Sequence, residues 1–354
     1  MIIPGWSGRS PRLSLTATTL QAQECRVQVG IFALSAVVSL VASVLLVSRL
    51  ERVGERLGLS EALLGLLAAL AADGPEITAS VTAIAGGHAT VGIGVTLGSN
   101  VFNLAALLGL SALIAGRVGF HRRSILLEGG VGLWIALLSL GVVAGLIGPA
   151  VGLLLALLVF IPYLAYSAER PEVRARLHLP GPWSDWLARA LAEEEAELAD
   201  AIHPARGDRW DASVALAACV VVIAASVVME ETATTLGTQA GVSAIVIGGL
   251  VLAGVTSLPN AVAAIYLAVR GRGAATLSEA FNSNAINAIV GLMLPGAILG
   301  LTRPSGDALF VALSYLILTE GCVVLALRGR GLGRRAGSLI IVVYLVFAAV
   351  LATR

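Results

Sequence analysis

The sequence predicts an all-α polytopic membrane protein whose ten transmembrane helices form two inverted five-helix repeats. Three observations predict this fold. Of the 354 residues, 57% are hydrophobic and 13% are charged, and the mean hydropathy is +0.92, a composition typical of membrane proteins. Most of the arginines fall in one of the two alternating sets of segments that ten spans create. A group of polar residues also recurs along the chain at a constant offset.

A helix needs about 20 mostly apolar residues to cross the hydrocarbon core of a bilayer. Two pairs of predicted spans are longer than this, which is typical of tilted or broken helices. The 40 glycines suit a bundle of closely packed helices. The ten predicted spans are 29–48, 58–85, 89–115, 124–146, 149–167, 212–229, 241–269, 273–301, 307–327 and 336–352.

The spans divide the chain into two repeats, 29–167 and 212–354, joined by a loop at 168–211. Residues 1–28 contain no long apolar run and no signal-peptide cleavage site, so we expect a disordered N-terminal tail. The loop holds an acidic helical stretch at 184–201. Its charge favours a solvated linker helix over the alternative, a cytosolic cation sensor.

The basic residues predict the orientation. All 23 are arginines, and eighteen of them fall in one alternate set of inter-span segments, which includes the 168–211 loop. Because basic residues concentrate in the loops on the cytoplasmic side of a membrane, we expect this loop inside and both termini outside. The protein is then a multi-pass protein, which we expect in a bacterial inner membrane.

A polar pattern in the first repeat returns in the second after 184 positions. Five spans separate the copies, so they should cross the membrane in opposite directions. Inverted repeats with broken helices that meet at the bilayer midplane are typical of secondary transporters. The offset aligns Pro75 with Pro259, Glu76 with Asn260, Ser99 with Ser283, Asn100 with Asn284 and Asn103 with Asn287.

The segment GVTSLPN, 254–260, combines a helix break with polar side chains inside an apolar run. Pro259, like Pro75 in the first copy, removes one helical hydrogen bond and so frees a backbone carbonyl. Irregular backbone at membrane depth is tolerated where it is buried or lines a cavity, and polar residues inside spans are usually functional. We therefore expect both the breaks and the polar residues to face an ion. The alternative is that the prolines serve packing and the polar residues join helices.

Two carboxylates stand at the first break. Asp73 and Glu76 are three residues apart, hence near one face of a helix. In a low dielectric two carboxylates repel, so we expect them to hold a proton or a cation between them. A hard cation such as Ca²⁺ binds six to eight oxygens, which carboxylates, amides, hydroxyls and freed carbonyls together could supply.

The segments 73–114 and 254–295 resemble the cation/calcium exchanger superfamily, in particular the sodium/calcium exchangers. The family pattern is Gly-Thr-Ser-X-Pro-Glu followed by Gly-Ser-Asn-X-Phe-Asn, and this chain has GSNVFN in one copy and GVTSLPN in the other. The resemblance implies ten spans and a midplane cation site. With Asp73 added for its charge, the predicted ligands are Asp73, Glu76, Ser99, Asn103, Thr256, Ser257, Asn260, Ser283 and Asn287.

The sequence departs from the family pattern twice. The first copy has Ala72-Asp73-Gly74 where the family has Thr-Ser-X, and the second has Asn260 where the family usually has glutamate. Both carboxylates of the predicted site therefore come from the first copy, which leaves the ion and the stoichiometry open. Elsewhere, Glu320 could carry protons or contact a neighbouring helix, and Glu128 should be interfacial.

The leading hypothesis is a secondary antiporter, driven by an ion gradient, that exchanges Ca²⁺ or a similar cation for Na⁺ or H⁺. A passive cation channel, a sodium/proton exchanger and an intramembrane enzyme are the alternatives. The chain has no Gly-rich loop followed by Lys-Ser/Thr, so we expect no nucleotide and no cofactor. The net charge of +1 gives no reason to expect nucleic acid. The expected partners are inorganic cations and membrane lipid.

Overall fold

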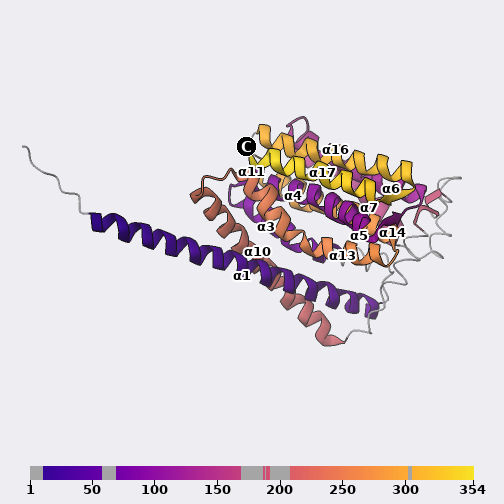
Figure 1. Ribbon diagram of the computed structural model, residues 1–354. Helices are drawn as coiled ribbons and strands as arrows, with labels where there is room; N and C mark the ends of the chain where they lie inside the picture. Colours follow the sequence, from indigo (N-terminus) through magenta and orange to yellow (C-terminus); the bar gives the residue numbers. More distant parts are fainter. Residues whose placement is uncertain (1–10, 58–68, 169–185, 188, 192–207, 302–304) are drawn as a thin grey trace, which may run out of the picture.

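The computed structural model describes residues 11–57, 69–168, 186–187, 189–191, 208–301 and 305–354 (Figure 1). These residues form a bundle of roughly parallel and antiparallel helices. In the first half the elements are α1 (Pro11–Leu57), α3 (Gly74–Ala85), α4 (Ala89–Asn103), the π-helix η1 (Leu104–Leu110), α5 (Ser111–Ala115), β1 (Arg117–Gly119), α6 (Arg122–Val143) and α7 (Pro149–Ala168).

The second half is also almost wholly helical and contains two further π-helices. Its elements are α10 (Arg209–Gln239), α11 (Ala244–Val246), the π-helix η2 (Ile247–Leu252), α12 (Ala253–Thr256), α13 (Leu258–Val269), α14 (Gly273–Ile286), the π-helix η3 (Asn287–Met293), α15 (Leu294–Leu299), α16 (Gly306–Gly329), β2 (Gly331–Gly333) and α17 (Arg334–Ala352).

Among the described residues, eight helices are long and apolar enough to cross a membrane. A bent pair, 244–256 with 258–269, brings the number to nine if it is one span. These nine correspond to nine of the ten predicted spans. The other, 58–85, includes residues 58–68, which lie outside the described part of the chain, so a total of ten spans stays a prediction.

Helix boundaries recur at the offset that the sequence predicted. Adding 184 to the bounds of α3 gives the bounds of α13, and adding it to 89–115 gives 273–299. The glycines that follow 89–115 and 273–299 both have a positive φ, 83° at Gly116 and 80° at Gly300. The two halves are therefore alike in backbone as well as in polar pattern.

The centre of the bundle depends on small residues. Helix α4 is buried along nearly its whole length and crosses η2 at glycines. A Cβ added at Gly98 would lie 2.5 Å from the Cα of Gly249, and one added at Gly94 would lie 2.9 Å from the Gly249 nitrogen. Only glycine allows backbones to approach this closely, so these contacts fix how the two halves fit together.

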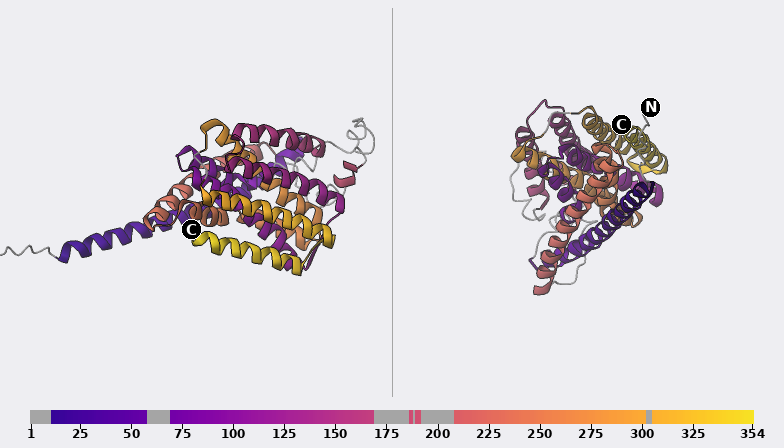
Figure 2. Two further views of the ribbon diagram at one scale, coloured as in Figure 1. Left: turned by 90° about the horizontal axis from the view of Figure 1, so that it is seen from above. Right: turned by 90° about the vertical axis from the view of Figure 1, so that its left-hand side faces the viewer.

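Helices α1 and α10 lie side by side along one edge of the bundle, and α1 extends well beyond it (Figures 1 and 2). A buried hydrogen bond of 2.9 Å joins the hydroxyls of Ser39 and Ser226. Large apolar side chains on both helices face outward, for example Val41 and Leu216, which are 65% and 69% exposed. Such surfaces are what a lipid-facing pair of helices presents.

Three features of the structure add to the sequence-based picture. First, α1 begins at Pro11 and so reaches into the predicted tail, 1–28, of which residues 1–10 lie outside the description. Second, β1 and β2 pair antiparallel, with Val118 opposite Leu332; these glycine-flanked stretches are too short to be recognised as strands. Third, Ala190 and Leu191 of the linking loop are buried, and Ser124 donates to the Ala190 carbonyl at 2.7 Å.

Candidate cation site

The two helix breaks have the same local structure. Asp73 precedes α3 with φ −75° and ψ −8°, and Ser257 precedes α13 with φ −81° and ψ −1°. A proline stands at the second position of each helix, where its missing N–H removes a bond to the preceding turn. At the first break the hydroxyl of Ser43 donates to the carbonyl of Ala71 at 3.1 Å. At the second, the helix axis bends by 47°.

Asp73 and Glu76 are both buried, with exposures of 0% and 1%. Oδ1 of Asp73 accepts hydrogen bonds from Asn260 Nδ2 at 2.6 Å and from Ser283 Oγ at 2.7 Å. Glu76 accepts one from Asn287 Nδ2. Asp73 and Glu76 are thus both held by neutral donors of the second half, on α13, α14 and η3.

Asparagines join the two halves symmetrically. Nδ2 of Asn100 donates to the Asn284 carbonyl at 3.0 Å, and Nδ2 of Asn284 donates to the Asn100 carbonyl at 3.1 Å. Asn103 adds donations to Ser283 Oγ at 3.3 Å and to Asn284 Oδ1 at 3.1 Å. Asn100 and Asn284 therefore connect α4 to α14 beside the predicted ligands.

All nine predicted ligands are buried, with exposures of 0% or 1%, and hydrogen bonds bring several of them together. Asn260, Ser283 and Asp73 form one group, next to Asn103, and Asn287 and Glu76 form another. Ser257 Oγ has no hydrogen-bond partner among the described residues. Thr256 instead donates its hydroxyl proton to the Leu252 carbonyl at 2.9 Å, which leaves it only a lone pair to offer a cation. Ser99 lies in α4 one turn before Asn103.

Several oxygens in this cluster are buried and have no hydrogen-bond partner among the described residues. An unpaired buried acceptor costs about 1–3 kcal/mol, so a concentration of them needs a physical explanation. Acceptors without donors are the groups that bind a hard cation. The unpaired oxygens are Asp73 Oδ2, Glu76 Oε1, Ser99 Oγ, Asn100 Oδ1, Asn103 Oδ1, Ser257 Oγ, Asn260 Oδ1 and Asn287 Oδ1.

The electrostatics of this cluster are asymmetric. Within the described residues, no group of three or more His, Cys, Asp or Glu side chains could hold a metal ion. A cation bound at the cluster would therefore have two carboxylates, both from the first half, and would complete its shell with neutral oxygens from both halves. Such a mixed set of oxygens suits Ca²⁺ or Na⁺ better than a transition metal.

Sequence reasoning missed a second polar group one helical turn from Glu76. The Ser80 hydroxyl lies 2.7 Å from Thr96 Oγ1, 2.9 Å from the Gly92 carbonyl and 2.8 Å from the Gly291 carbonyl. Ser80 follows Glu76 by four residues and therefore lies on the same helical face. This spacing could have identified Ser80 from the sequence. The three π-helices were also missed, although η1 follows Asn103 directly and η3 begins at Asn287. π-helical turns occur frequently at functional sites.

Three other acidic side chains lie away from the cluster. Glu128, which was expected to be interfacial, is buried within the protein, and Tyr163 donates to its carboxylate at 2.8 Å, which supplies the partner that a buried acid needs. Glu320 is exposed on α16. Glu230, which follows the predicted end of the sixth span, is buried and accepts a hydrogen bond from Thr234 at 3.0 Å.

Known proteins resemble the chain in sequence and in fold. Residues 27–168 and 211–353 match the family described as sodium/calcium exchanger protein. Over 73 residues, 20% of this chain, it is 41% identical to sodium/potassium/calcium exchanger 4 of Homo sapiens, and this match spans only 12% of the human protein's length.

Two solved structures have a similar fold. The crystal structure of an H⁺/Ca²⁺ exchanger, CAX, gives a TM-score of 0.65 at 16% identity, covering 96% of this chain and 91% of the other. The sodium-calcium exchanger NCX_Mj gives 0.59 at 20% identity, covering 93% of this chain and 100% of its own. At these identities the likeness shows a shared fold.

Proposed function

Because the chain belongs to the sodium/calcium exchanger protein family, we propose that it is a secondary antiporter that exchanges Ca²⁺, or a similar cation, for Na⁺ or H⁺. The family and the proteins of similar fold are ion exchangers, so the prediction of a multi-pass membrane transporter rather than an enzyme is confirmed. The counter-ion, the position of the site in the membrane and the ligands are the parts that we propose.

One observation supports the site best: the buried pair Asp73 and Glu76 lies among unpaired oxygens from both halves of the chain. Carboxylates inside a membrane are costly unless they bind a substrate or a proton. We assign them as the charged ligands of the transported cation. The neutral ligands are then Ser99, Asn103, Thr256, Ser257, Asn260, Ser283 and Asn287, with Thr256 in the weakest position.

The two halves would act as inverted repeats around this site. The recurrence of helix boundaries at an offset of 184 supports this, as does the reciprocal pair of hydrogen bonds between Asn100 and Asn284, residues separated by the same offset. In transporters of this kind, one bundle rocks against the other and exposes the central site to each side in turn. Hydrogen bonds from the second half to Asp73 and Glu76 would then change during transport.

The charge of the site favours few counter-ions. Two carboxylates carry at most two negative charges, which one Ca²⁺ neutralises. Little charge would be left to attract several Na⁺ ions in its place. Protons, or a small number of Na⁺ ions, are therefore the counter-ions that this site favours.

The deciding experiment is reconstitution of the full chain in vesicles, with Ca²⁺ uptake measured under an imposed Na⁺ gradient, an imposed H⁺ gradient or neither. We expect uptake against a Ca²⁺ gradient only when one of the two counter-ions can leave the vesicle. Ca²⁺ flux that only follows its own gradient would indicate a channel. Coupled Na⁺ and H⁺ movement that ignores Ca²⁺ would indicate a sodium/proton exchanger.

We also propose that the protein lies in a bacterial inner membrane with the 168–211 loop inside and both termini outside. The arginine distribution supports this orientation. Single cysteines introduced in the loop and at the carboxyl end of a chain without its native cysteines can be labelled in intact cells with an impermeant reagent. We expect labelling only at the carboxyl end, and the reverse pattern would contradict the orientation.

A further inference from the structure

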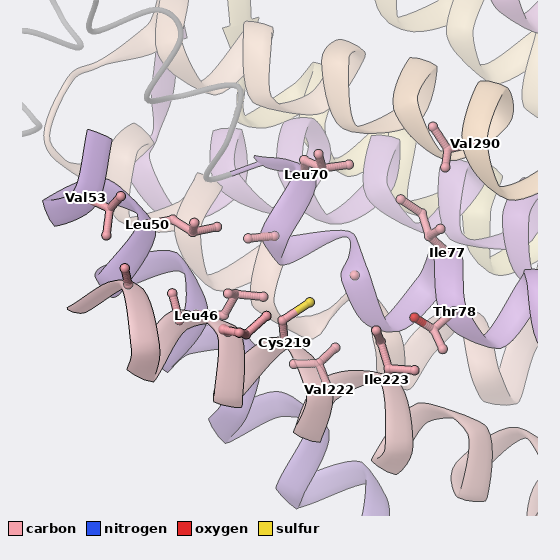
Figure 3. Close-up of a pocket in the computed structure, with 15 residues that line it drawn as sticks. Leu46, Leu50, Val53, Leu70, Ile77, Thr78, Cys219, Val222, Ile223 and Val290 are labelled. Atoms are coloured by element: carbon pink, nitrogen blue, oxygen red, sulfur yellow. The ribbon is translucent and has the colours of Figure 1, made fainter. Parts of the chain in front are cut away.

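An apolar cavity of about 500 Å³ lies between α1, α3 and α10 (Figure 3). Leu46, Leu50 and Val53 of α1 line one wall, and Cys219 and Val222 of α10 line another. Other lining side chains belong to the outer surface, because Leu70, Leu216 and Ile223 are 42%, 69% and 47% exposed. The cavity is therefore open to the surface that faces lipid in a membrane protein.

Positive charge lies at the end of this cavity where α1 and α10 meet. Nη1 of Arg49 is 2.6 Å from Asp211 Oδ1, and Nη1 of Arg52 is 3.8 Å from the same oxygen. Asp211 also accepts from the backbone N–H of Asp208 through its other oxygen, at 2.7 Å. Two guanidinium groups thus share one carboxylate oxygen, and the buried Nε of Arg49 has no hydrogen-bond partner among the described residues.

The charged end adjoins the apolar part directly. Leu50 and Ala212, which line the cavity, follow Arg49 and Asp211 in the sequence. Trp210 is 75% exposed beside them, and tryptophan is enriched where a protein crosses from hydrocarbon to headgroup. From one end to the other, the order is thus an exposed tryptophan, two guanidinium groups that share one carboxylate oxygen, and the apolar cavity.

We propose that this cavity binds an anionic phospholipid, with an acyl chain between α1, α3 and α10 and the phosphate on Arg49 and Arg52. Guanidinium groups suit phosphate because their planar N–H groups match its oxygens. Basic pockets between transmembrane helices recognise anionic headgroups in this way. A zwitterionic lipid could fill the apolar slot equally well, but its headgroup would bring no net charge to the arginines.

The lipid would touch the start of the broken helix. Gly74 and Ile77 line the cavity, and they are the immediate neighbours of Asp73 and Glu76. A Cβ added at Gly74 would lie 3.4 Å from Val222 Cγ1, so α3 and α10 are in contact beside the cavity. An acyl chain would therefore pack against the start of α3, next to both carboxylates. Its presence would affect how α3 moves relative to α1 and α10.

The test is native mass spectrometry of the purified full chain with phosphatidylglycerol or phosphatidylcholine added at equal concentration, a readout that does not require transport. Arg52→Gln is the headgroup variant, because Arg49 then still pairs with Asp211. Cys219→Phe fills the slot. The matched controls are Arg328→Gln, an exposed arginine on α16, and Val220→Phe, an exposed position on α10 outside the cavity.

We expect the parent to bind phosphatidylglycerol more tightly than phosphatidylcholine. Arg52→Gln should lower this preference about fivefold, Cys219→Phe should lower binding of both lipids, and the controls should match the parent. Thermal unfolding without added lipid checks that the variants are folded. Equal binding of the two lipids by the parent, or an unchanged preference in Arg52→Gln, would overturn the proposal. So would inorganic phosphate that displaces phosphatidylglycerol and stabilises the chain as much as this lipid does, since the site would then be one for free anions.

Discussion

The helix that follows the first break and the helix that follows the second differ in charge but not in backbone. α3 and α13 have the same length, the same proline position and the same conformation at the preceding residue. Yet Asp73 and Glu76 of the first half correspond to Ser257 and Asn260 of the second. The comparison indicates that both halves of the fold keep the helix break, whereas the two carboxylates of the site occur in the first half alone.

The neutral half is not passive, because its side chains hold the charged half. Asn260 and Ser283 donate to Asp73, and Asn287 donates to Glu76. Amide and hydroxyl groups can turn between donating to a carboxylate and offering an oxygen to a cation. The second half can therefore stabilise the carboxylates when no cation is bound and contribute ligands when one is. Four sets of variants test this comparison of the two halves.

Loss of the Glu76 charge should have the largest effect. We expect Glu76→Gln to reduce gradient-driven Ca²⁺ uptake by about 100-fold or more, because it removes one of two charged ligands. Uptake by purified protein in vesicles measures this, with folding checked by size-exclusion chromatography. Glu231→Gln is the matched control, since Glu231 is an exposed glutamate in another apolar helix, α10. Normal transport by the Glu76 variant would refute the assignment of the site.

A carboxylate placed in the second half should change the coupling. Asn260→Glu puts a third acid beside Asp73, where Asn260 now donates a hydrogen bond at 2.6 Å. Like charges in a low dielectric require an additional cation or proton, so we expect about one more counter-ion for each Ca²⁺. The reversal potential of the transport current, with Na⁺ and H⁺ gradients imposed separately, measures the ratio. Steep multi-sodium dependence without any response to pH in the parent would contradict the charge argument.

The asparagine pair tests whether the halves are equivalent in structure. Asn100→Ala and Asn284→Ala each remove a side-chain donor from a buried carbonyl of the other half, which keeps its backbone donor, at a cost of about 0.5–1.5 kcal/mol of unfolding free energy. Asn284→Ala should cost more, because Asn284 also accepts a hydrogen bond from Asn103. Denaturant unfolding in detergent measures both variants. Asn282→Ala, which loses only a bond to Ser278 on the same helix, should change the stability by less than about 0.5 kcal/mol.

The sequence predicted most of this comparison, because polar residues and prolines are rare in apolar spans and their spacing is easy to follow. The offset that aligns Asn100 with Asn284 also relates the helix boundaries. Which side chains bond to one another could not be predicted, since it depends on how α3 packs against α4 and η3. The π-helices could not be predicted either, because one extra residue in a helical turn does not change the pattern of a segment that is apolar throughout. The cavity beside α1 could not be predicted, because a cavity depends on which side chains fail to pack against one another in the folded chain.

The smallest effect should come from the position where the second half has a hydroxyl and the first half has none. At an offset of 184, Thr256 corresponds to Ala72, and both are buried, with exposures of 1% and 6%. The Thr256 hydroxyl donates its proton to Leu252, so it can contribute only a lone pair to a cation. We expect Thr256→Ala to raise the Ca²⁺ concentration for half-maximal uptake by about threefold or less. Thr256→Ser, which keeps the hydroxyl, is the control and should behave like the parent. A loss above about tenfold in the alanine variant alone would make Thr256 a principal ligand. The two breaks would then differ in ligand geometry as well as in charge, because the first break has no hydroxyl at the corresponding residue.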